Sequence, residues 1–560
     1  MRPTKVFAQE KNVYYIVETV TPILKRAGMY PATMRNLEFL MPNGPIFPSA
    51  PNQSTVADAQ SGVNTRRRRL LAAAAMTPLA VAASPLAAQN IAAVVHTAAG
   101  DFTGIQRDGI WAYKGIRYGQ DTAASRFAPP LAAPPEKMPI RAWEFAPISP
   151  QRGSAKGVQS EDCLFLNIWT GAPDVRAKKT VMVYIHGGAY ATGSGNDAET
   201  DGATLAARGD VVVVTITHRL NVFGYLYLGA GDARFPDSGN AGQLDLVLAL
   251  QWIRRHIAAF GGDANNVMVF GQSGGGAKIA TLMAMPAAKG LFHRAATMSG
   301  QQVTASGPIN AQRRTRAYLA KLQIDPVTAP VLALVEALSA VDPVLGGQVY
   351  FGPVLDNRTL LRHPFYPDAH PQGNSIPMML GNTIAETRAF FPPGHAKLSG
   401  LNWQNIAEGI EPELRVDIAA GMVVARYRQW FPQKSPLEIF IAATTDSRSW
   451  RAQVIEAEER ARAGVPAFVY QLDFEDAAHT ADIALVFGTK PGMSVAQRAM
   501  SGKMMDAFVA FAKTGNPGWA AYTLPARTTM IFDAPSRLEN DPRRRQRELF
   551  ATVPYVQPGT

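Results

Sequence analysis

The sequence has 560 residues, of which 47% are hydrophobic and 18% charged, so it carries enough apolar surface for a globular protein. The formal net charge of +11 is unevenly distributed: residues 1–88 hold 10 Lys and Arg against 4 Asp and Glu, and the remainder holds 45 against 40. Because residues 89–560 are only mildly basic and lack basic clusters interleaved with aromatic residues, the sequence argues against nucleic-acid binding.

The N-terminal 88 residues are expected to lie outside the folded domain. Residues 63–88 combine four consecutive arginines, an Ala- and Leu-rich run and small residues before Gln89, which is the order of a secretory signal peptide. The paired arginines resemble a twin-arginine signal. Because the apolar run is too short to span a bilayer, we expect an exported, periplasmic or secreted protein without stable membrane insertion. A basic loop before a surface helix is the alternative.

Residues 1–62 precede this signal and are left unassigned. Export signals stand at the start of a chain, so we hypothesise that translation begins near Val63 and that residues 1–62 are an extension of the gene model. N-terminal sequencing of the exported protein tests this hypothesis, and a mature N-terminus upstream of Val63 would contradict it. Residues 89–560 are expected to form one domain.

From Val94 onward, short β-rich runs alternate with stretches of helical periodicity. This alternation predicts an α/β fold with a central, mostly parallel, twisted sheet covered by helices. The predicted strands are residues 180–185, 211–216 and 267–270, and the predicted helices are residues 203–208, 244–257 and 278–285. The more helical and polar stretches 304–350 and 393–465 are interpreted as cap and excursion segments on the same core.

Cys163 is the only cysteine of the chain. A single cysteine excludes an intrachain disulfide and any metal site built from several cysteines. We expect a buried, apolar thiol. A thiol nucleophile is disfavoured, because the neighbouring carboxylates of Glu161 and Asp162 would raise the pKa of the thiol.

Residues 271–275 read Gly-Gln-Ser-Gly-Gly and lie between the predicted strand 267–270 and a helical run. In this setting the motif places its serine in a strained tight turn, whose neighbours must be small so that the hydroxyl stands clear above the sheet. We therefore predict that Ser273 is a nucleophile; the alternative is a Gly-rich connection with a capping serine. A second Gly-rich segment, residues 186–190, follows the strand 180–185, where an oxyanion loop belongs.

These segments resemble the type-B carboxylesterase family, which includes cholinesterases and bacterial p-nitrobenzyl esterases. Residues 260–275 reproduce the family's extended nucleophile signature, and residues 161–168 reproduce most of its second signature. Segments 113–118 and 511–517 match as well, so the resemblance covers roughly residues 94–532. It implies an α/β-hydrolase fold, ester hydrolysis, and no metal or organic cofactor.

A serine hydroxyl needs a base, and the chain order in this fold is serine, acid, histidine. The resemblance identifies His479, in a polar loop before an apolar run, as the general acid/base. Glu386 follows the apolar run 378–380 at the offset of the family's acid, where it would hold the imidazole in its productive tautomer. Asp356 is the alternative acid, although its segment resembles a turn of the family.

The same resemblance assigns the oxyanion hole to the N–H groups of Gly188, Ala189 and Gly274, and makes Ser299 a hydrogen-bonding neighbour of the site. It implies a serine carboxylesterase that hydrolyses small-molecule esters through a Ser-His-Glu triad and an acyl-enzyme. The same machinery could instead serve an amide, a carbamate or a lactone, because selectivity lies in the surrounding pocket. A non-catalytic relative of the adhesion type is a further alternative. The oligomeric state is left open.

Overall fold

The computed structural model describes residues 6–10, 13–17, 93–153 and 156–557, so the predicted signal segment 63–88 lies outside the described residues. The chain divides into two units, Met1–Ser84 and Pro85–Thr560. In the first unit, β1 (Val6–Glu10) and β2 (Val13–Val17) pair as an antiparallel hairpin. All the elements described below belong to the second unit.

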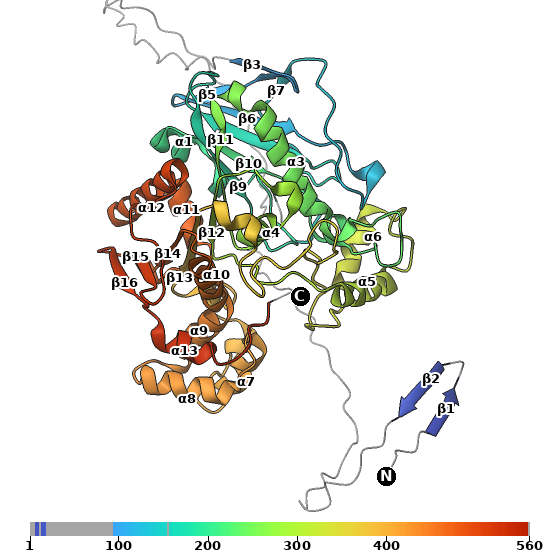
Figure 1. Cartoon of the computed structure of the whole chain (residues 1–560), viewed down its shortest axis with the longest axis vertical. Coiled ribbons are helices and arrows are strands. Elements are labelled where there is room, and N and C mark those ends of the chain that lie inside the picture. Colours follow the sequence, from blue (N-terminus) through green and yellow to red (C-terminus); the bar gives the residue numbers. More distant parts are fainter. Residues whose placement is uncertain (1–5, 11–12, 18–92, 154–155, 558–560) are drawn as a thin grey trace, which may run out of the picture. The chain divides into compact units, whose positions relative to one another are not determined.

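In the described part of the second unit, eleven strands form one mixed sheet (Figure 1). The strands from β10 to β15 run parallel, whereas those at both margins run antiparallel to their neighbours. The prediction of a central, mostly parallel sheet is therefore confirmed. In pairing order the strands are β16 (Arg537–Asn540), β15 (Thr528–Phe532), β14 (Ala467–Leu472), β13 (Met378–Thr383), β12 (Arg294–Met298), β11 (Gly262–Gln272), β9 (Lys179–Ile185), β10 (Val212–Ile216), β8 (Phe165–Thr170), β6 (Ile110–Arg117) and β5 (Ile105–Arg107). A small separate sheet contains β3 (Val94–Thr97), β4 (Gly100–Thr103) and β7 (Ile140–Arg141).

The predicted central strands are buried on both faces, as their continuous apolar sequences require. Along β9, Val181 and Val183 enter one core cluster, whereas Met182 and Tyr184 enter the cluster on the opposite face. This alternation follows from the two-residue period of a strand. Because both faces of the strand contact core residues, a continuous apolar sequence is found in the middle of the sheet.

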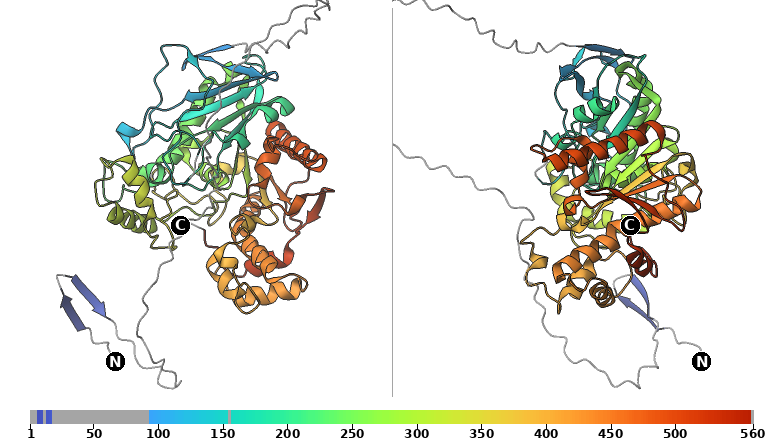
Figure 2. Two further views of the ribbon diagram at one scale, coloured as in Figure 1. Left: turned by 180° about the vertical axis from the view of Figure 1, so that it is seen from behind. Right: turned by 90° about the vertical axis from the view of Figure 1, so that its left-hand side faces the viewer.

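Helices cover both faces of the sheet (Figure 2). One face is covered by α3 (Ala241–His256), α4 (Gly274–Leu282) and α10 (Arg451–Arg462), and the other by α1 (Ala203–Gly209), α11 (Ala481–Phe487) and α12 (Val495–Thr514). The helix expected over 278–285 begins earlier, at Gly274, because the turn after β11 leads directly into it. Among the described helices, none is both long and apolar enough to cross a membrane.

The two predicted excursions carry clusters of their own. In the first, α5 (Pro308–Leu322) and α6 (Val331–Glu336) pack with α2 (Asn221–Tyr225) around a separate apolar cluster. In the second, α7 (Ile406–Ile410), α8 (Ala420–Trp430) and α9 (Pro436–Thr445) pack with α13 (Arg544–Phe550). The interpretation of 393–465 as an excursion is wrong for its last part, because α10 packs on β13 and β14 and buries Ala452 and Ala457 in the main core.

Candidate active site

Ser273 stands at the turn between β11 and α4. Its φ of 54° and ψ of −123° lie outside the regions that non-glycine residues favour. The surrounding backbone is crowded: a Cβ atom added to Gly271 would lie 2.6 Å from the carbonyl oxygen of Ile185, and one added to Gly275 would lie 2.0 Å from the same oxygen. The side chain of Ser273 makes no capping hydrogen bond to α4. The alternative interpretation of Ser273 as a helix-capping residue is therefore not supported.

Glu386 and His479 lie on loops that follow the neighbouring parallel strands β13 and β14. Because the carboxyl ends of parallel strands meet at one edge of a sheet, the two loops lie side by side. The amide of Ala385 donates to the carbonyl of Ala477 at 3.0 Å, which joins the loops. A short hydrogen bond connects Nδ1 of His479 to a carboxylate oxygen of Glu386.

Glu386 is fully buried, and its carboxylate accepts several further hydrogen bonds. Thr383 N donates at 2.7 Å, Asn382 Nδ2 donates at 3.2 Å, and the hydroxyl of Ser299 donates to the same oxygen. Burial by itself would raise the pKa of the Glu386 carboxyl, but the nearby imidazole and these hydrogen bonds outweigh burial and hold the pKa below its usual value. The carboxylate is therefore held ionised, and Ser299 is one of its hydrogen-bond partners.

Ser273 and His479 line one cavity of about 150 Å³. Among the described residues, no hydrogen bond joins the serine hydroxyl to the imidazole. Instead, Nε2 of His479 lies 3.2 Å from the side-chain nitrogen of Gln272. With the proton on Nδ1 facing Glu386, Nε2 is an acceptor for the Gln272 amide. Catalytic hydrogen bonds of unliganded enzymes often form fully only when substrate binds.

The predicted oxyanion loop follows β9, and Ala189 and Gly274 line the same cavity as Ser273. The loop lies against the turn, since a Cβ added to Gly274 would lie 2.2 Å from the carbonyl oxygen of Ala189. In the described part of the chain, the amides of Gly188, Ala189 and Gly274 donate to no protein acceptor. The amides of Ala189 and Gly274 are therefore available to a ligand in the cavity, and Gly188 precedes Ala189 in the same loop.

The structure places Asp356 elsewhere. Its carboxylate caps a turn by accepting from the backbone amides of Arg358, Thr359 and Leu360, and from the side chain of Asn240. Within the described residues it makes no contact with His479.

Several residues near the site could not be assigned from sequence patterns. The ring of Phe390 lies 4.9 Å from the imidazole of His479, and Lys278 is fully buried below the oxyanion loop. Lys278 Nζ donates to the carbonyl of His186 at 3.0 Å and lies 5.6 Å from the ring centroid of Tyr190. Both partners belong to the loop segment 186–190, so this lysine supports the loop. Burial lowers the pKa of Lys278 to about 7.

This burial predicts a pH-dependent stability. The folded-state pKa of Lys278 lies below its unfolded value of 10.5, so between pH 7 and pH 10.5 the unfolded chain binds more protons. The free energy of unfolding should therefore rise with pH, by up to about 1.4 kcal/mol per pH unit from this residue. In denaturant titrations from pH 7 to pH 9, Lys278→Met should flatten that rise. The control is Lys289→Met, at an exposed lysine soon after α4, and equal slopes in all three proteins would contradict the prediction.

Cys163 is buried, and burial raises the pKa of its thiol, so it is not a nucleophile at neutral pH. Among the described residues, no three His, Cys, Asp or Glu side chains lie together as a metal site would need.

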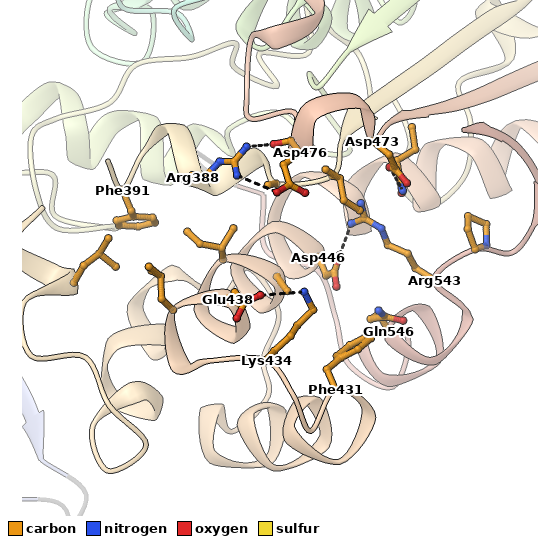
Figure 3. Close-up of a pocket in the computed structure, with 18 of the residues that line it drawn as sticks. Arg388, Phe391, Phe431, Lys434, Glu438, Asp446, Asp473, Asp476, Arg543 and Gln546 are labelled. Carbon is orange, nitrogen blue, oxygen red and sulfur yellow. Dashed lines mark hydrogen bonds and ion pairs between the residues drawn. The ribbon is translucent and has the colours of Figure 1, made fainter. Parts of the chain in front are cut away.

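A larger cavity of about 630 Å³ borders the same two loops (Figure 3). Ile384, Ala385 and Asp476 line it, so the segments that carry Glu386 and His479 form part of its wall. Arg543 and Asp446, which form an ion pair, are among the charged residues that line this cavity. None of the predicted site residues lines this cavity. Ser273, Ala189, Gly274, Ser299 and His479 instead line the smaller cavity.

A mixed sheet, a serine in a strained strand-to-helix turn and a histidine–carboxylate pair at the carboxyl ends of the strands define an α/β-hydrolase. The model of the carboxylesterase family matches residues 91–541, and the chain belongs to this family. It is a carboxylic ester hydrolase, as the resemblance of its signatures predicted.

This chain matches several known esterases over nearly their whole length. The para-nitrobenzyl esterase of Bacillus subtilis (strain 168) is 33% identical over 498 residues, which are 81% of this chain and 98% of the relative. The crystal structure of a carboxylesterase of Geobacillus stearothermophilus at pH 6.2 superposes with a TM-score of 0.73 at 32% identity, covering 82% of this chain and 99% of the other. An esterase from Clostridium hathewayi that can hydrolyze aliphatic aromatic polyesters has a TM-score of 0.69 at 30% identity, covering 83% and 99%.

Proposed function

We propose that the protein is a serine carboxylesterase in which Ser273, His479 and Glu386 form a catalytic triad. The observation that carries the proposal is the hydrogen bond between Glu386 and His479, whose imidazole lines the same cavity as the strained Ser273. A buried carboxylate on Nδ1 leaves Nε2 free of a proton, which is the state that a general base requires.

The reaction proceeds in two halves. Nε2 of His479 exchanges its contact with Gln272 for the hydroxyl of Ser273 and takes the proton as the serine oxygen attacks the ester carbonyl. The amides of Gly188, Ala189 and Gly274 stabilise the oxyanion, an effect worth about 100- to 1000-fold in kcat for each donor. The imidazole passes the proton to the leaving alcohol. Water then attacks the acyl-enzyme by the same route, which releases the acid and restores Ser273.

The size of the cavity favours small acyl groups. A cavity of about 150 Å³ accommodates a group the size of a benzene ring. We expect kcat/KM of the full-length protein to be highest among 4-nitrophenyl acetate, propionate and butyrate, and about tenfold lower for the decanoate, measured by release of 4-nitrophenol. Rates that rise steadily to the decanoate would contradict this size limit.

Adding a 4-nitroanilide, a carbamate and a lactone to this panel separates the alternative functions. An amidase, a carbamate hydrolase or a lactonase would turn over a 4-nitroanilide, a carbamate or a lactone faster than the best ester. A non-catalytic relative would cleave none of them. The names of the relatives, a para-nitrobenzyl esterase and carboxylesterases, favour the ester.

A further inference from the structure

The cavity at Ser273 contains one guanidinium group, that of Arg448. Its other lining residues are apolar or carry hydroxyl, carboxamide and imidazole groups, and none of them is an aspartate or a glutamate. Arg448 is half-buried and belongs to a π-helical turn, Asp446–Trp450, between α9 and α10. Such turns interrupt the regular helix and occur often at functional sites.

Arg448 has no acidic partner among the described residues. No carboxylate oxygen lies within 4.0 Å of its guanidinium nitrogens, and it makes no hydrogen bond to a described residue. Two more deeply buried arginines of this chain are paired with carboxylates: Arg219 with Asp245 at 2.7 Å, and Arg543 with Asp446. An arginine facing a reaction cavity without a counter-charge is free to bind an anion.

The guanidinium is held in place by stacking. Its central carbon lies 4.8 Å from the ring centroid of Phe390, and that ring lies 4.9 Å from the imidazole of His479. The cation therefore has a defined position relative to the base. A second cation, Arg415, lies nearby: burial lowers the pKa of its guanidinium most, and the charge of Arg448 lowers it further, whereas the charge of Glu413 raises it.

We propose that Arg448 forms an anion subsite in the cavity and that the preferred substrates are small esters carrying a free carboxylate. The inference rests on the proposed function and narrows its substrate class. The carboxylate lies either on the acyl side, as in the half-ester of a dicarboxylic acid, or on the alcohol side. A guanidinium–carboxylate hydrogen bond in a partly desolvated cavity should raise kcat/KM about 10- to 100-fold.

The test compares each anionic ester with its methyl-masked neutral form. For the acyl side these are 4-nitrophenyl hydrogen glutarate and its methyl ester. For the alcohol side they are 4-carboxyphenyl butyrate and its methyl ester. Arg448→Met should lower kcat/KM for the anionic member about 10- to 100-fold more than for the neutral member in one of the two pairs, and the affected pair identifies the side. Arg448→Lys, which keeps the charge, should recover part of the difference.

Arg428 supplies the matched control. It is exposed on α8 and stacks on Trp403 with its central carbon 4.2 Å from the ring centroid, so Arg428→Met removes a similar stacked cation away from the cavity. For this variant, the ratio of kcat/KM for the anionic ester to kcat/KM for the neutral ester should equal that of the wild type. Equal losses on both members of both pairs in Arg448→Met, or the same discrimination in Arg428→Met, would overturn the subsite.

A binding experiment separates this inference from the proposed function. Calorimetric titration with monomethyl glutarate should show affinity about tenfold or more weaker for Ser273→Ala/Arg448→Met than for Ser273→Ala, whether or not the wild type turns over esters. Equal affinities would overturn the subsite. A wild type that hydrolyses none of the four esters would refute the proposed function alone.

Discussion

Replacing Ser273 with alanine is expected to lower kcat for 4-nitrophenyl butyrate by about 10⁴- to 10⁶-fold. The variant loses the only atom that forms the acyl-enzyme, while the amides of the oxyanion loop and the histidine remain. Residual hydrolysis should therefore be a direct attack by water. Steady-state kinetics measure the loss, and mass spectrometry after reaction with a fluorophosphonate should find the label on Ser273 of the wild type and no label on the variant.

The control for this substitution is Ser339→Ala, an exposed serine whose hydroxyl donates only to the carbonyl of Glu336 among the described residues. It should hydrolyse the ester and take the label as the wild type does. If Ser273→Ala kept more than a few per cent of the wild-type rate, another nucleophile would have to carry the reaction.

The second large effect is expected for Glu386→Gln, with kcat reduced about 10³- to 10⁴-fold. The oxygens of Glu386 accept hydrogen bonds from His479, Ser299, Thr383 and Asn382. A glutamine amide would turn an N–H₂ group toward donors and would favour the tautomer of His479 with its proton on Nε2, which cannot take the serine proton. Because the negative charge is also lost, the imidazolium formed during attack is no longer stabilised.

Asp356→Asn is the matched substitution, because it makes the same chemical change at the competing acid. Since Asp356 caps a turn, Asp356→Asn should lower the free energy of unfolding by about 1 kcal/mol. It should leave kcat within a few-fold of the wild-type value. Kinetics and denaturant melts of the two variants separate the roles. A greater loss of activity in Asp356→Asn than in Glu386→Gln would reverse the assignment of the acid.

Much of the fold, and the turn that carries Ser273, could be predicted because the decisive segments are local. Ser273, Glu386 and His479 each follow a buried strand within a few residues, and parallel strands bring such loops to one edge of the sheet. The continuous apolar runs identified the central strands for the same reason. The strand and turn patterns depend on neighbours in the sequence, whereas the resemblance to the carboxylesterase family supplied the assignments of Glu386 and His479.

The contacts that were not predicted depend on packing between distant segments. The pairing of Gln272 with His479 joins residues 207 positions apart, and no pattern around either residue reveals it. The stacking of Arg448 on Phe390 brings together two helical turns whose facing sides are set by the tertiary fold. The polar surface of α10 suggested an excursion, although a narrow stripe of Ala452 and Ala457, with Ile455 and Ala461 beside it, packs the helix on the main core.

The burial of Cys163, the single cysteine, determines whether disulfide bonds take part in folding. With one thiol in the whole chain, no bond between sulfurs can close within it, and with that thiol enclosed, none can readily form between molecules. Acquiring the native state thus involves no oxidative step, and the same fold is accessible in a reducing cytosol and in an oxidising medium.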